Sequence, residues 1–382
     1  MLRRSLAAAA VGVGALVAGS TAGLAPATAA APAVQSHTPR AKGFPAGSLA
    51  ALADGVRLRV GAAINTDLLG TDATYTALAG SEFSTVTPEN SMKWEVVEPQ
   101  QGTYDWSGGD KLVAFAQAHN QLVRGHNLVW HSQLPKWLTP DGVTTTFTND
   151  QVKAILKKHV IDEATHFKGK IWQWDVVNEA FNDDGTPRQD IWYKAWGGLG
   201  YIADAFRWAH QADSKALLFY NDYNIEYTGP KSNAEYAFIK GLKQSGVPID
   251  GVGFQTHLDT QYGFPDLKNN LQRFADLGLK VAETEVDVRT FTKPAPDVNV
   301  PASGLAQAAQ EAYWMKTLQA CLAVRPCISY TAWGISDKNS WVPGVFAGEG
   351  AALLWDEGYQ PKPQFTDLQD LLALSQDGRR HG

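Results

Sequence analysis

The feature that most constrains the fold of this chain is a repeated alternation between short apolar runs and longer segments with helical periodicity. Each run is about six to ten residues long, which suits one buried strand. Two of the intervening segments, residues 110–120 and 201–211, have the clearest helical spacing of apolar side chains. The candidate strands are Leu58–Ile64, Phe83–Pro88, Gln121–Trp130, Ile171–Val177, Ala216–Asp222, Gly251–Thr256, Leu279–Val288 and Ile328–Gly334.

Alternating strands and helices predict a parallel sheet, because a crossover helix returns the chain to the same end of the sheet. Eight such strands predict a (β/α)8 barrel (a TIM barrel, of the α/β class) that forms a single catalytic domain. The length of 382 residues suits one such barrel. An open, doubly wound sheet is the alternative, but no Gly-rich phosphate-binding turn follows the first strand.

The two ends of the chain lack this alternation. Arg3 and Arg4 precede an apolar, Ala-rich run to about Ala18, and small residues follow up to Ala29. This is the pattern of a secretory signal peptide, and the run is too short for a membrane anchor. We therefore predict a signal peptide at 1–30, a flexible leader at 31–46, the barrel at 47–374 and a frayed tail at 375–382, in a protein secreted to the extracellular space.

The composition narrows the choice of partners. The net charge is −6 and no long basic run occurs, which argues against nucleic acid, because phosphate binding needs clustered Lys and Arg. The 13 Trp residues can fill a core, or they can stack against the C–H face of a sugar. The only cysteines, Cys321 and Cys327, are close in sequence, and in an exported protein such a pair favours a disulfide over two free thiols.

Polar and aromatic residues gather where the candidate strands end. Enzymes with this fold place their catalytic groups at the carboxyl ends of the strands. Any one such residue is more often a hydrogen-bonded structural residue than a catalyst, but their agreement around one rim indicates a functional site. They are Glu89, Asn90, Lys93, His126, Trp130, His131, Asn178, Glu179, Asn221, Asp222, Gln255, His257, Glu285, Asp287, Trp333, Asp337 and Trp341.

Two carboxylates stand out among them. Glu179 lies in the run WDVVNEAF, with apolar residues before and after it. Glu285 lies between Glu283 and Asp287, and the period of two predicts that these three acids share one face of a strand. Buried carboxylates need partners, so the run indicates either a functional site or structural ion pairs. Cleavage of a glycosidic bond uses two opposed carboxylates, one to protonate the leaving oxygen and one to attack or to activate water.

Seven motifs together closely resemble glycoside hydrolase family 10, whose known members are mainly endo-xylanases. The motifs are TPENSMKW (87–94), GHNLVWHSQLP (125–135), WDVVNEAF (174–181), NDYNIE (221–226), GFQTHL (253–258), TEVDV (284–288) and TAWGISDKNSW (331–341). The resemblance extends over roughly Gly47 to Leu374. It implies a (β/α)8 barrel that hydrolyses β-1,4-xylosidic bonds inside xylan chains, with retention of the anomeric configuration.

The resemblance also assigns roles to individual residues. Glu179 would be the general acid/base and Glu285 the nucleophile, while His257 with Asp287 would orient and tune Glu285. Asn178 would hold the 2-hydroxyl of the reacting sugar, Gln255 would contact the same sugar, and Tyr223 would lie on the leaving-group side. The glycone-side contacts would be Glu89, Asn90, Lys93, His126, Trp130, Gln133, Trp333 and Trp341. The Cys321–Cys327 pair fits the family, and no cofactor is implied.

The chain departs from the family pattern at two positions. Glu283 stands where an aliphatic residue is usual. If it shares the face of Glu285, it could raise a neighbouring pKa by like-charge repulsion; equally, a basic residue deeper in the barrel could pair with it. Asn339 stands where Tyr is common.

Three other functions are compatible with parts of the pattern. A cellulase or mannanase on a related barrel would share Asn-Glu after the fourth strand, although TPENSMKW and TAWGISDKNSW favour a xylanase. A non-catalytic xylan-binding or inhibitor-like protein would not need both Glu179 and Glu285. For a metal hydrolase only His126 and His131 are close in sequence, and no His-Glu-x-x-His motif occurs, so we expect no metal. We expect a monomer that acts on xylan and binds no membrane.

Overall fold

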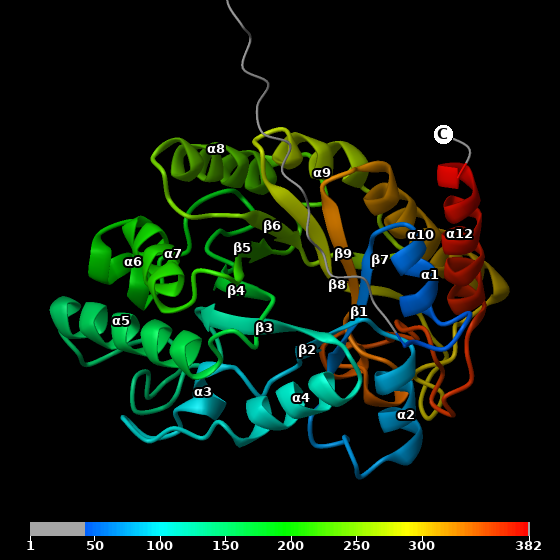
Figure 1. Cartoon of the computed structure of the whole chain (residues 1–382), viewed down its shortest axis with the longest axis horizontal. Coiled ribbons are helices and arrows are strands. Elements are labelled where there is room, and N and C mark those ends of the chain that lie inside the picture. The colour runs from blue at the N-terminus through cyan, green and yellow to red at the C-terminus, as the bar shows by residue number, and fades with distance from the viewer. Residues whose placement is uncertain (1–42, 381–382) are drawn as a thin grey trace, which may run out of the picture. The chain divides into compact units, whose positions relative to one another are not determined.

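The structure, a computed structural model, describes residues 43–380 and contains a closed parallel barrel of eight strands (Figure 1). Each barrel strand pairs in parallel with its neighbours, and β9 pairs with both β8 and β1, which closes the barrel. The strands are β1 (Arg59–Ile64), β2 (Thr85–Pro88), β3 (Leu122–Val129), β4 (Gln173–Asn178), β5 (Leu217–Asp222), β6 (Gly251–Phe254), β8 (Lys280–Phe291) and β9 (Cys327–Ala332). The barrel prediction is confirmed, and the open sheet is excluded.

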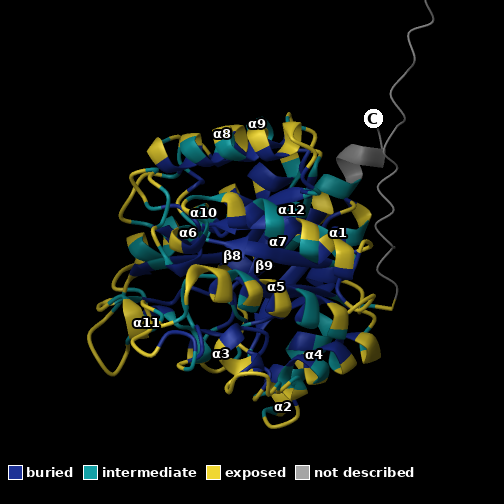
Figure 2. Cartoon of the chain, turned by 90° about the vertical axis from the view of Figure 1, so that its left-hand side faces the viewer, coloured by how far each residue is buried: buried dark blue, intermediate teal, exposed yellow. Residues whose placement is uncertain are grey.

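Every barrel strand overlaps one of the eight apolar runs in the sequence. These strands are buried almost throughout, as expected for parallel strands that carry helices on one face and a filled barrel on the other (Figure 2). Gly125 on β3 faces Trp174 on β4, and a Cβ at Gly125 would lie only 2.2 Å from the indole. A larger residue at 125 would therefore displace the Trp174 ring from the layer between barrel and helices.

Helices surround the barrel in the order that the alternation predicted. The two segments with the clearest helical spacing form α4 (Ser107–Ala118) and α7 (Gly200–Ala212). On α7 the residues that turn inward, Ile202, Ala205, Phe206 and Ala209, are spaced three and four apart. The others are α1 (Leu49–Gly55), α2 (Ala73–Ser81), α3 (Trp94–Val97), α5 (Asn149–His166), α6 (Ile191–Trp196), α8 (Pro230–Gln244), α9 (Leu267–Ala275), α10 (Gly304–Ala323), the 3-10 turn η1 (Asp337–Asn339), α11 (Val342–Val345) and α12 (Pro363–Arg380).

Strand β8 is longer than the sequence predicted. It continues three residues beyond Val288, and residues 287–291 of β8 pair with two short strands that the sequence did not reveal. These are β7 (His257–Asp259), which is parallel to it, and β10 (Glu349–Gly350), which is antiparallel. The strand therefore extends beyond Asp287 at its carboxyl end.

The prediction that Glu283, Glu285 and Asp287 share one face is wrong. Thr284 Oγ1 donates to Asn221 Oδ1 at 2.6 Å, and Asn221 Nδ2 donates to Glu285 Oε1 at 2.8 Å. Two successive residues thus contact the same side chain, where the pairing register of β8 with β9 shifts. The regular alternation is interrupted at this point, and Glu283 is left on the opposite face from Glu285.

The neighbours of Glu283 in the sheet identify that opposite face. Glu283 lies beside Phe254 of β6 and Tyr330 of β9, whose rings contact Phe274 on α9 and Trp314 on α10. The carboxyl is fully buried there, and no side chain among the described residues donates a hydrogen bond to either of its oxygens. Burial raises the pKa of Glu283 well above its ordinary value, and the charge of Glu226 raises it further. A basic partner was one of the two alternatives for Glu283, and none is found among residues 43–380. The protonated form is therefore favoured.

The predicted disulfide is confirmed: Cys321 near the end of α10 is bonded to Cys327 at the start of β9. The segment predicted as a signal peptide, 1–30, and all but residues 43–46 of the predicted leader lie outside the described residues. The segment predicted as a frayed tail is helical as far as Arg380, and Gln376 donates to the carbonyl oxygen of Leu52 at the start of the fold. Within residues 43–380, no helix is long and apolar enough to span a bilayer.

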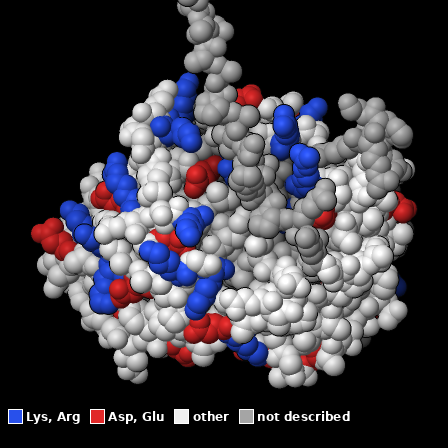
Figure 3. Space-filling view, in the orientation of Figure 1, with Lys and Arg blue, Asp and Glu red and all other residues white. Residues whose placement is uncertain are grey.

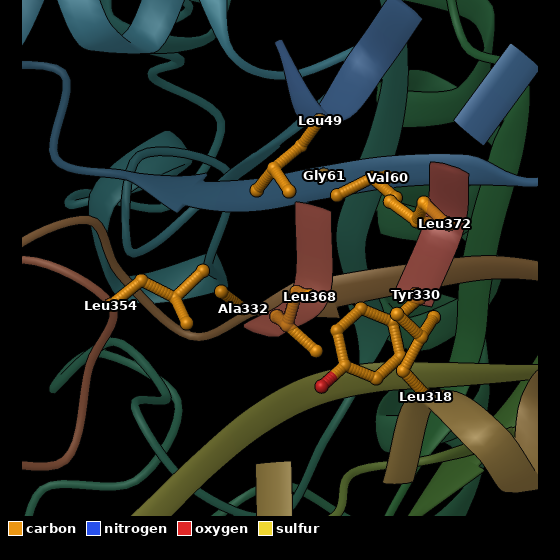
Figure 4. Close-up of a pocket in the computed structure, with 9 residues that line it drawn as sticks. All are labelled: Leu49, Val60, Gly61, Leu318, Tyr330, Ala332, Leu354, Leu368 and Leu372. Atoms are coloured by element: carbon orange, nitrogen blue, oxygen red, sulfur yellow. The ribbon is translucent and has the colours of Figure 1, made fainter. Parts of the chain in front are cut away.

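Charged side chains are interspersed rather than segregated on the face shown in Figure 3, where basic and acidic groups lie next to one another. Between β1, β9 and the covering helices, apolar side chains line a small gap (Figure 4). Leu318 of α10 and Leu368 of α12 close it from the helix side, and the Tyr330 hydroxyl is within hydrogen-bond distance of Thr317. This gap belongs to the packing of the core and offers no polar group to a ligand.

Candidate active site

The predicted rim residues converge at the carboxyl ends of the barrel strands, and Glu285 lies in the middle of them. Its carboxylate accepts hydrogen bonds from Asn221 at 2.8 Å and Arg124 at 3.3 Å, and His257 Nε2 lies 3.3 Å away. Burial alone would raise the pKa of Glu285, but His126, His257 and Arg124 outweigh it and hold this pKa well below its usual range. Glu285 is therefore ionised throughout the neutral range.

Arg124 and Asp175 support this carboxylate, and neither was singled out from the sequence. Arg124 Nε donates to Asp175 Oδ1 at 3.2 Å, Nη1 donates to the carbonyl oxygen of Thr284 at 2.7 Å, and Nη2 contacts both Asp175 and Glu285. His126 Nδ1 lies 2.8 Å from Asp175 Oδ2. A signal was present, because Arg124 and His126 are two residues apart in a predicted strand and so share one face of it.

His126, Asp175 and Glu285 each offer one atom to a common point, within 4.8 Å of one another, as the ligands of a metal ion would. The guanidinium of Arg124 lies among them and donates to both carboxylates. A permanent positive charge thus already lies between these two carboxylates. The arrangement is accounted for by an Arg-centred network of hydrogen bonds.

Glu179 follows β4 directly and is held by different groups. Its Oε2 accepts from Trp130 Nε1 at 2.9 Å, and its Oε1 accepts from Gln255 Nε2 at 3.0 Å and from Asn178 Nδ2 at 3.2 Å. His131 Nδ1 lies 3.9 Å away, and burial lowers the pKa of His131 to about 4 against the opposing charge of Glu179. The direct hydrogen-bond donors of Glu179 are therefore uncharged at neutral pH.

Two asparagines connect the carboxylates. Asn221 Nδ2 donates to Glu285 Oε1 and also to Asn178 Oδ1, each at 2.8 Å. Asn178 in turn donates to Glu179 at 3.2 Å. The two acids thus lie on either side of a continuous hydrogen-bonded network that joins the ends of β4 and β5 to the middle of β8. Asn221 was recognised in the sequence only as a polar residue of the rim.

His257, Asp287 and Trp341 form a chain that ends on Glu285. Trp341 Nε1 donates to Asp287 Oδ2 at 2.7 Å, and the same carboxylate lies 3.0 Å from His257 Nδ1. Burial opposes the charged form of His257, but Asp287 and Glu285 prevail and raise its pKa to about 10. Trp333 is almost buried and meets the rings of His126 and His257 edge-on, at centroid distances of 5.2 Å and 6.3 Å.

A second group of predicted residues lies on the other side of Glu179. Lys93 Nζ donates to Asn90 Oδ1 at 3.0 Å and lies 4.9 Å from the centroid of the Trp130 ring. Gln133 Nε2 donates to the same Asn90 oxygen at 3.3 Å. Burial raises the pKa of the half-buried Glu89, although Lys93 opposes this. Polar groups around an indole ring are what a hydroxyl-rich ring would need for binding.

Tyr223 and Asn339 stand apart from the two carboxylates. The Tyr223 hydroxyl accepts from Arg188 Nη2 at 3.3 Å, and Lys231 Nζ lies over its ring, 3.3 Å from the centroid. Tyr223 has no direct bond to Glu179 or Glu285 among the described contacts. Asn339 in η1 donates to the Tyr359 hydroxyl at 3.4 Å and contacts neither acid. Its departure from the family pattern therefore leaves the central network intact.

Comparisons with known proteins agree with this geometry. Residues 48–371 match the sequence pattern of Glycosyl hydrolase family 10. The chain is 41% identical to endo-1,4-beta-xylanase C of Phanerodontia chrysosporium over 301 aligned residues. The aligned region covers 78% of this chain and 72% of that protein. It superimposes on native xylanase 10B of Thermotoga maritima with a TM-score of 0.79 and 40% identity, over 87% of this chain and 100% of the other.

Xylanase 10B of Thermotoga petrophila RKU-1, solved in complex with xylobiose, is equally similar, with a TM-score of 0.79 and 40% identity over 86% of this chain and 98% of that one. The family match covers most of the chain, and it includes both carboxylates and the network between them. The chain is a glycoside hydrolase and belongs to glycosyl hydrolase family 10.

Proposed function

We propose that this enzyme is an endo-1,4-β-xylanase that cleaves xylan with retention, by a double displacement. The observation that carries the proposal is a pair of carboxylates, one directly after β4 and one within β8: the first is held by uncharged donors and the second by cationic groups. Related proteins named endo-1,4-beta-xylanase, and the xylobiose complex of the Thermotoga petrophila enzyme, support xylan as the substrate.

In the first step the ionised Glu285 attacks the anomeric carbon while Glu179 gives its proton to the leaving oxygen. The bond from that carbon to the leaving oxygen breaks, and a glycosyl ester forms on Glu285. In the second step Glu179 takes a proton from water, and the oxygen of that water displaces Glu285 from the anomeric carbon. The two inversions together give retention, and both carboxyl groups return to their initial states.

The neighbouring groups have roles that follow from what they contact. Arg124 and His257 keep Glu285 ionised and oriented, and Asp287 keeps His257 charged. Asn178 lies between the acids, where it can hold the 2-hydroxyl of the reacting sugar, and Gln255 can contact the same sugar. Trp130, Trp333 and Trp341 would enclose the reacting sugar and its glycone neighbour. Glu89, Asn90, Lys93, His126 and Gln133 would bind their hydroxyls, and Tyr223 would face the leaving group.

Three further properties belong to the same proposal. The enzyme acts in endo mode, because candidate sugar contacts lie on both sides of the carboxylate pair. It works as a secreted monomer without a cofactor, as the signal-like sequence and the side-chain chemistry of the site suggest. Detection of the mature chain in the culture medium, without residues 1–30, tests the export. Sedimentation of the purified chain tests the oligomeric state.

The central experiment measures hydrolysis of xylan, carboxymethyl cellulose and mannan by the wild type and by Glu285→Gln. We expect rapid hydrolysis of xylan, with viscosity falling well ahead of the release of reducing ends, and NMR should detect the β-anomer first. A preference for cellulose or mannan would reassign the substrate, and the α-anomer appearing first would refute retention. Full activity of Glu285→Gln would exclude this site as the catalytic one.

A further inference from the structure

The main chain of Glu179 has a conformation that needs support. Its φ is +58°, in the left-handed region that residues other than glycine seldom adopt. In this conformation the side chain reaches Trp130 and Gln255. A return to an ordinary backbone conformation would redirect the Cα–Cβ bond and move the carboxyl group away from both donors. Whatever holds this peptide therefore also holds the acid/base group in position.

Three hydrogen bonds fix the peptides around Glu179. Its N–H donates to the carbonyl oxygen of Asn221 at 2.9 Å, and the N–H of Ala180 donates to the Tyr220 hydroxyl at 3.1 Å. Both of these acceptors belong to β5. The third bond comes from elsewhere, because Arg188 Nε donates to the carbonyl oxygen of Glu179 at 2.9 Å.

The segment after Glu179 folds back to bring Arg188 to this place. Phe181 and Pro187 form an isolated antiparallel bridge, and the N–H of Arg188 donates to the carbonyl oxygen of Ala180 at 2.8 Å. The guanidinium has a second arm, since Nη2 donates to the Tyr223 hydroxyl at 3.3 Å and to the carbonyl oxygen of Phe181 at 3.4 Å. Tyr223 is the residue that would face the leaving group.

We propose that Arg188 is a positioning residue that ties the acid/base Glu179 to the leaving-group side of the cleft, by bridging the Glu179 carbonyl and the Tyr223 hydroxyl. This inference rests on the proposed roles of Glu179 and Tyr223. A planar guanidinium suits the bridge, because its nitrogens point in fixed directions and can serve two acceptors at once. Lys231, which lies over the Tyr223 ring and pairs with Asp222 at 2.8 Å, holds the same tyrosine from its face. A leaving group that settles against Tyr223 would thereby also steady the proton donor.

The test is a series of aryl β-xylobiosides whose leaving groups range from good to poor, measured with wild type, Arg188→Gln and Arg188→Lys. Protonation by Glu179 matters most for poor leaving groups. We expect Arg188→Gln to lower kcat/KM about 10- to 100-fold on the poorest leaving group and less than about threefold on the best. Arg188→Lys keeps the positive charge but lacks the planar guanidinium that serves two acceptors at once. We expect an intermediate loss of kcat/KM with the same dependence on the leaving group.

The matched control is Arg207→Gln on the exposed side of α7, where Arg207 pairs only with Asp204 among the described residues. If Arg188→Gln loses kcat/KM equally on all leaving groups, or not at all, the proposed positioning role of Arg188 is wrong. Wild-type kcat/KM values for Arg188→Lys would also contradict it. If Arg188→Gln does not fold, Arg188→Lys decides alone. Glu179→Ala in the same series separates the two proposals: if it has no leaving-group dependence, the role of Glu179 is wrong. If it has one and the Arg188 variants do not, only the bridge is wrong.

Discussion

Glu285 and Glu179 are the same type of residue in one site, but their surroundings are opposite. Glu285 is approached by the cationic Arg124 and His257, whereas Glu179 accepts from Trp130, Gln255 and Asn178, which are uncharged. A cationic donor stabilises a carboxylate strongly, while an uncharged donor serves an acid that must gain and lose a proton. The surroundings, rather than the residue type, thus suit the two carboxylates to the different roles proposed for them, nucleophile for Glu285 and acid/base for Glu179.

Glu285 and Glu179 also differ in backbone position and conformation. Glu285 lies inside the long strand β8, whereas Glu179 lies one residue beyond β4 in a left-handed conformation. The side chain of Glu179 is also more exposed, at 13% against 5% for Glu285. A group that exchanges protons with a sugar and with water has to reach the cleft. A group that forms an ester with one carbon benefits from being rigid.

The largest effect on activity should come from removing the ionised carboxylate, Glu285. Glu285→Ala should lower kcat at least about ten-thousand-fold on every substrate, because no glycosyl ester can form. Initial rates on xylan and on activated aryl xylobiosides measure this. Added azide should restore some activity by attacking from the vacated face, and should give the α-glycosyl azide. Retained activity without azide would break the comparison, since the ionised carboxylate would then not be the nucleophile.

The next effect depends on the substrate. Glu179→Ala should lower xylan hydrolysis by about 100- to 10,000-fold, the usual contribution of a general acid, because the sugar leaving group needs its proton. Aryl glycosides with good leaving groups should lose far less in their first step. Azide should accelerate turnover and yield the β-glycosyl azide, identified by NMR. The α-azide from this variant would exchange the two assigned roles.

A smaller effect tests whether the charge of His257 supports Glu285. His257 has a pKa raised to about 10, chiefly by Asp287, so its charge is present below that pH and is lost as the pH rises through about 10. In Asp287→Asn this loss should move to lower pH, and Glu285 should lose its charged donor earlier. We expect kcat/KM for an activated aryl xylobioside to fall about tenfold more than in the wild type at pH 9.

An activated substrate is essential here, because its first step depends little on Glu179 and so reports on Glu285. The matched control is Asp204→Asn on the exposed part of α7, which should leave the pH profile unchanged. Identical alkaline limbs in Asp287→Asn and wild type would mean that His257 does not tune the nucleophile.

The barrel could be predicted because each of its strands is buried, lies in a short run rich in apolar residues, and is separated by helical spacing from the next. The two proposed catalytic positions were identified by motif resemblance, and the structure places Glu179 directly after β4 and Glu285 within β8. The short strands β7 and β10 could not be foreseen, because three and two residues carry no periodicity. The clamp of Arg124 on Asp175 and Glu285 joins residues up to 161 positions apart, which local patterns do not reveal.

The register of β8 marks the limit of pattern-based reasoning. Strict alternation placed Glu283 beside Glu285, but the interruption at Thr284 and Glu285 turned Glu283 toward α9 and α10. A bulge of one residue is invisible to a period of two and reverses the face of everything before it. Its cause here is that both Thr284 and Glu285 bond to Asn221.

Glu283 provides the smallest and last prediction, as a third carboxyl that should affect stability but not catalysis. Its folded-state pKa lies well above the ordinary 4.5, with burial as the main cause. The folded protein therefore keeps a proton that the unfolded chain releases above about pH 4.5, so stability falls as the pH rises from there toward the folded-state pKa. The slope is at most about 1.4 kcal/mol per pH unit.

Glu283→Gln replaces the carboxyl by a group that does not titrate, so this slope should disappear. Denaturant unfolding of wild type and variant at several pH values measures it. The variant should be more stable by about 1 kcal/mol or more at pH 9, with a smaller difference near pH 5. The pH profile of kcat/KM should be unchanged, because Glu283 faces the helices and Glu285 faces the cleft. A shifted activity profile would mean that Glu283 acts on Glu285 after all, and parallel stability curves would mean that its carboxyl is ionised in the folded protein.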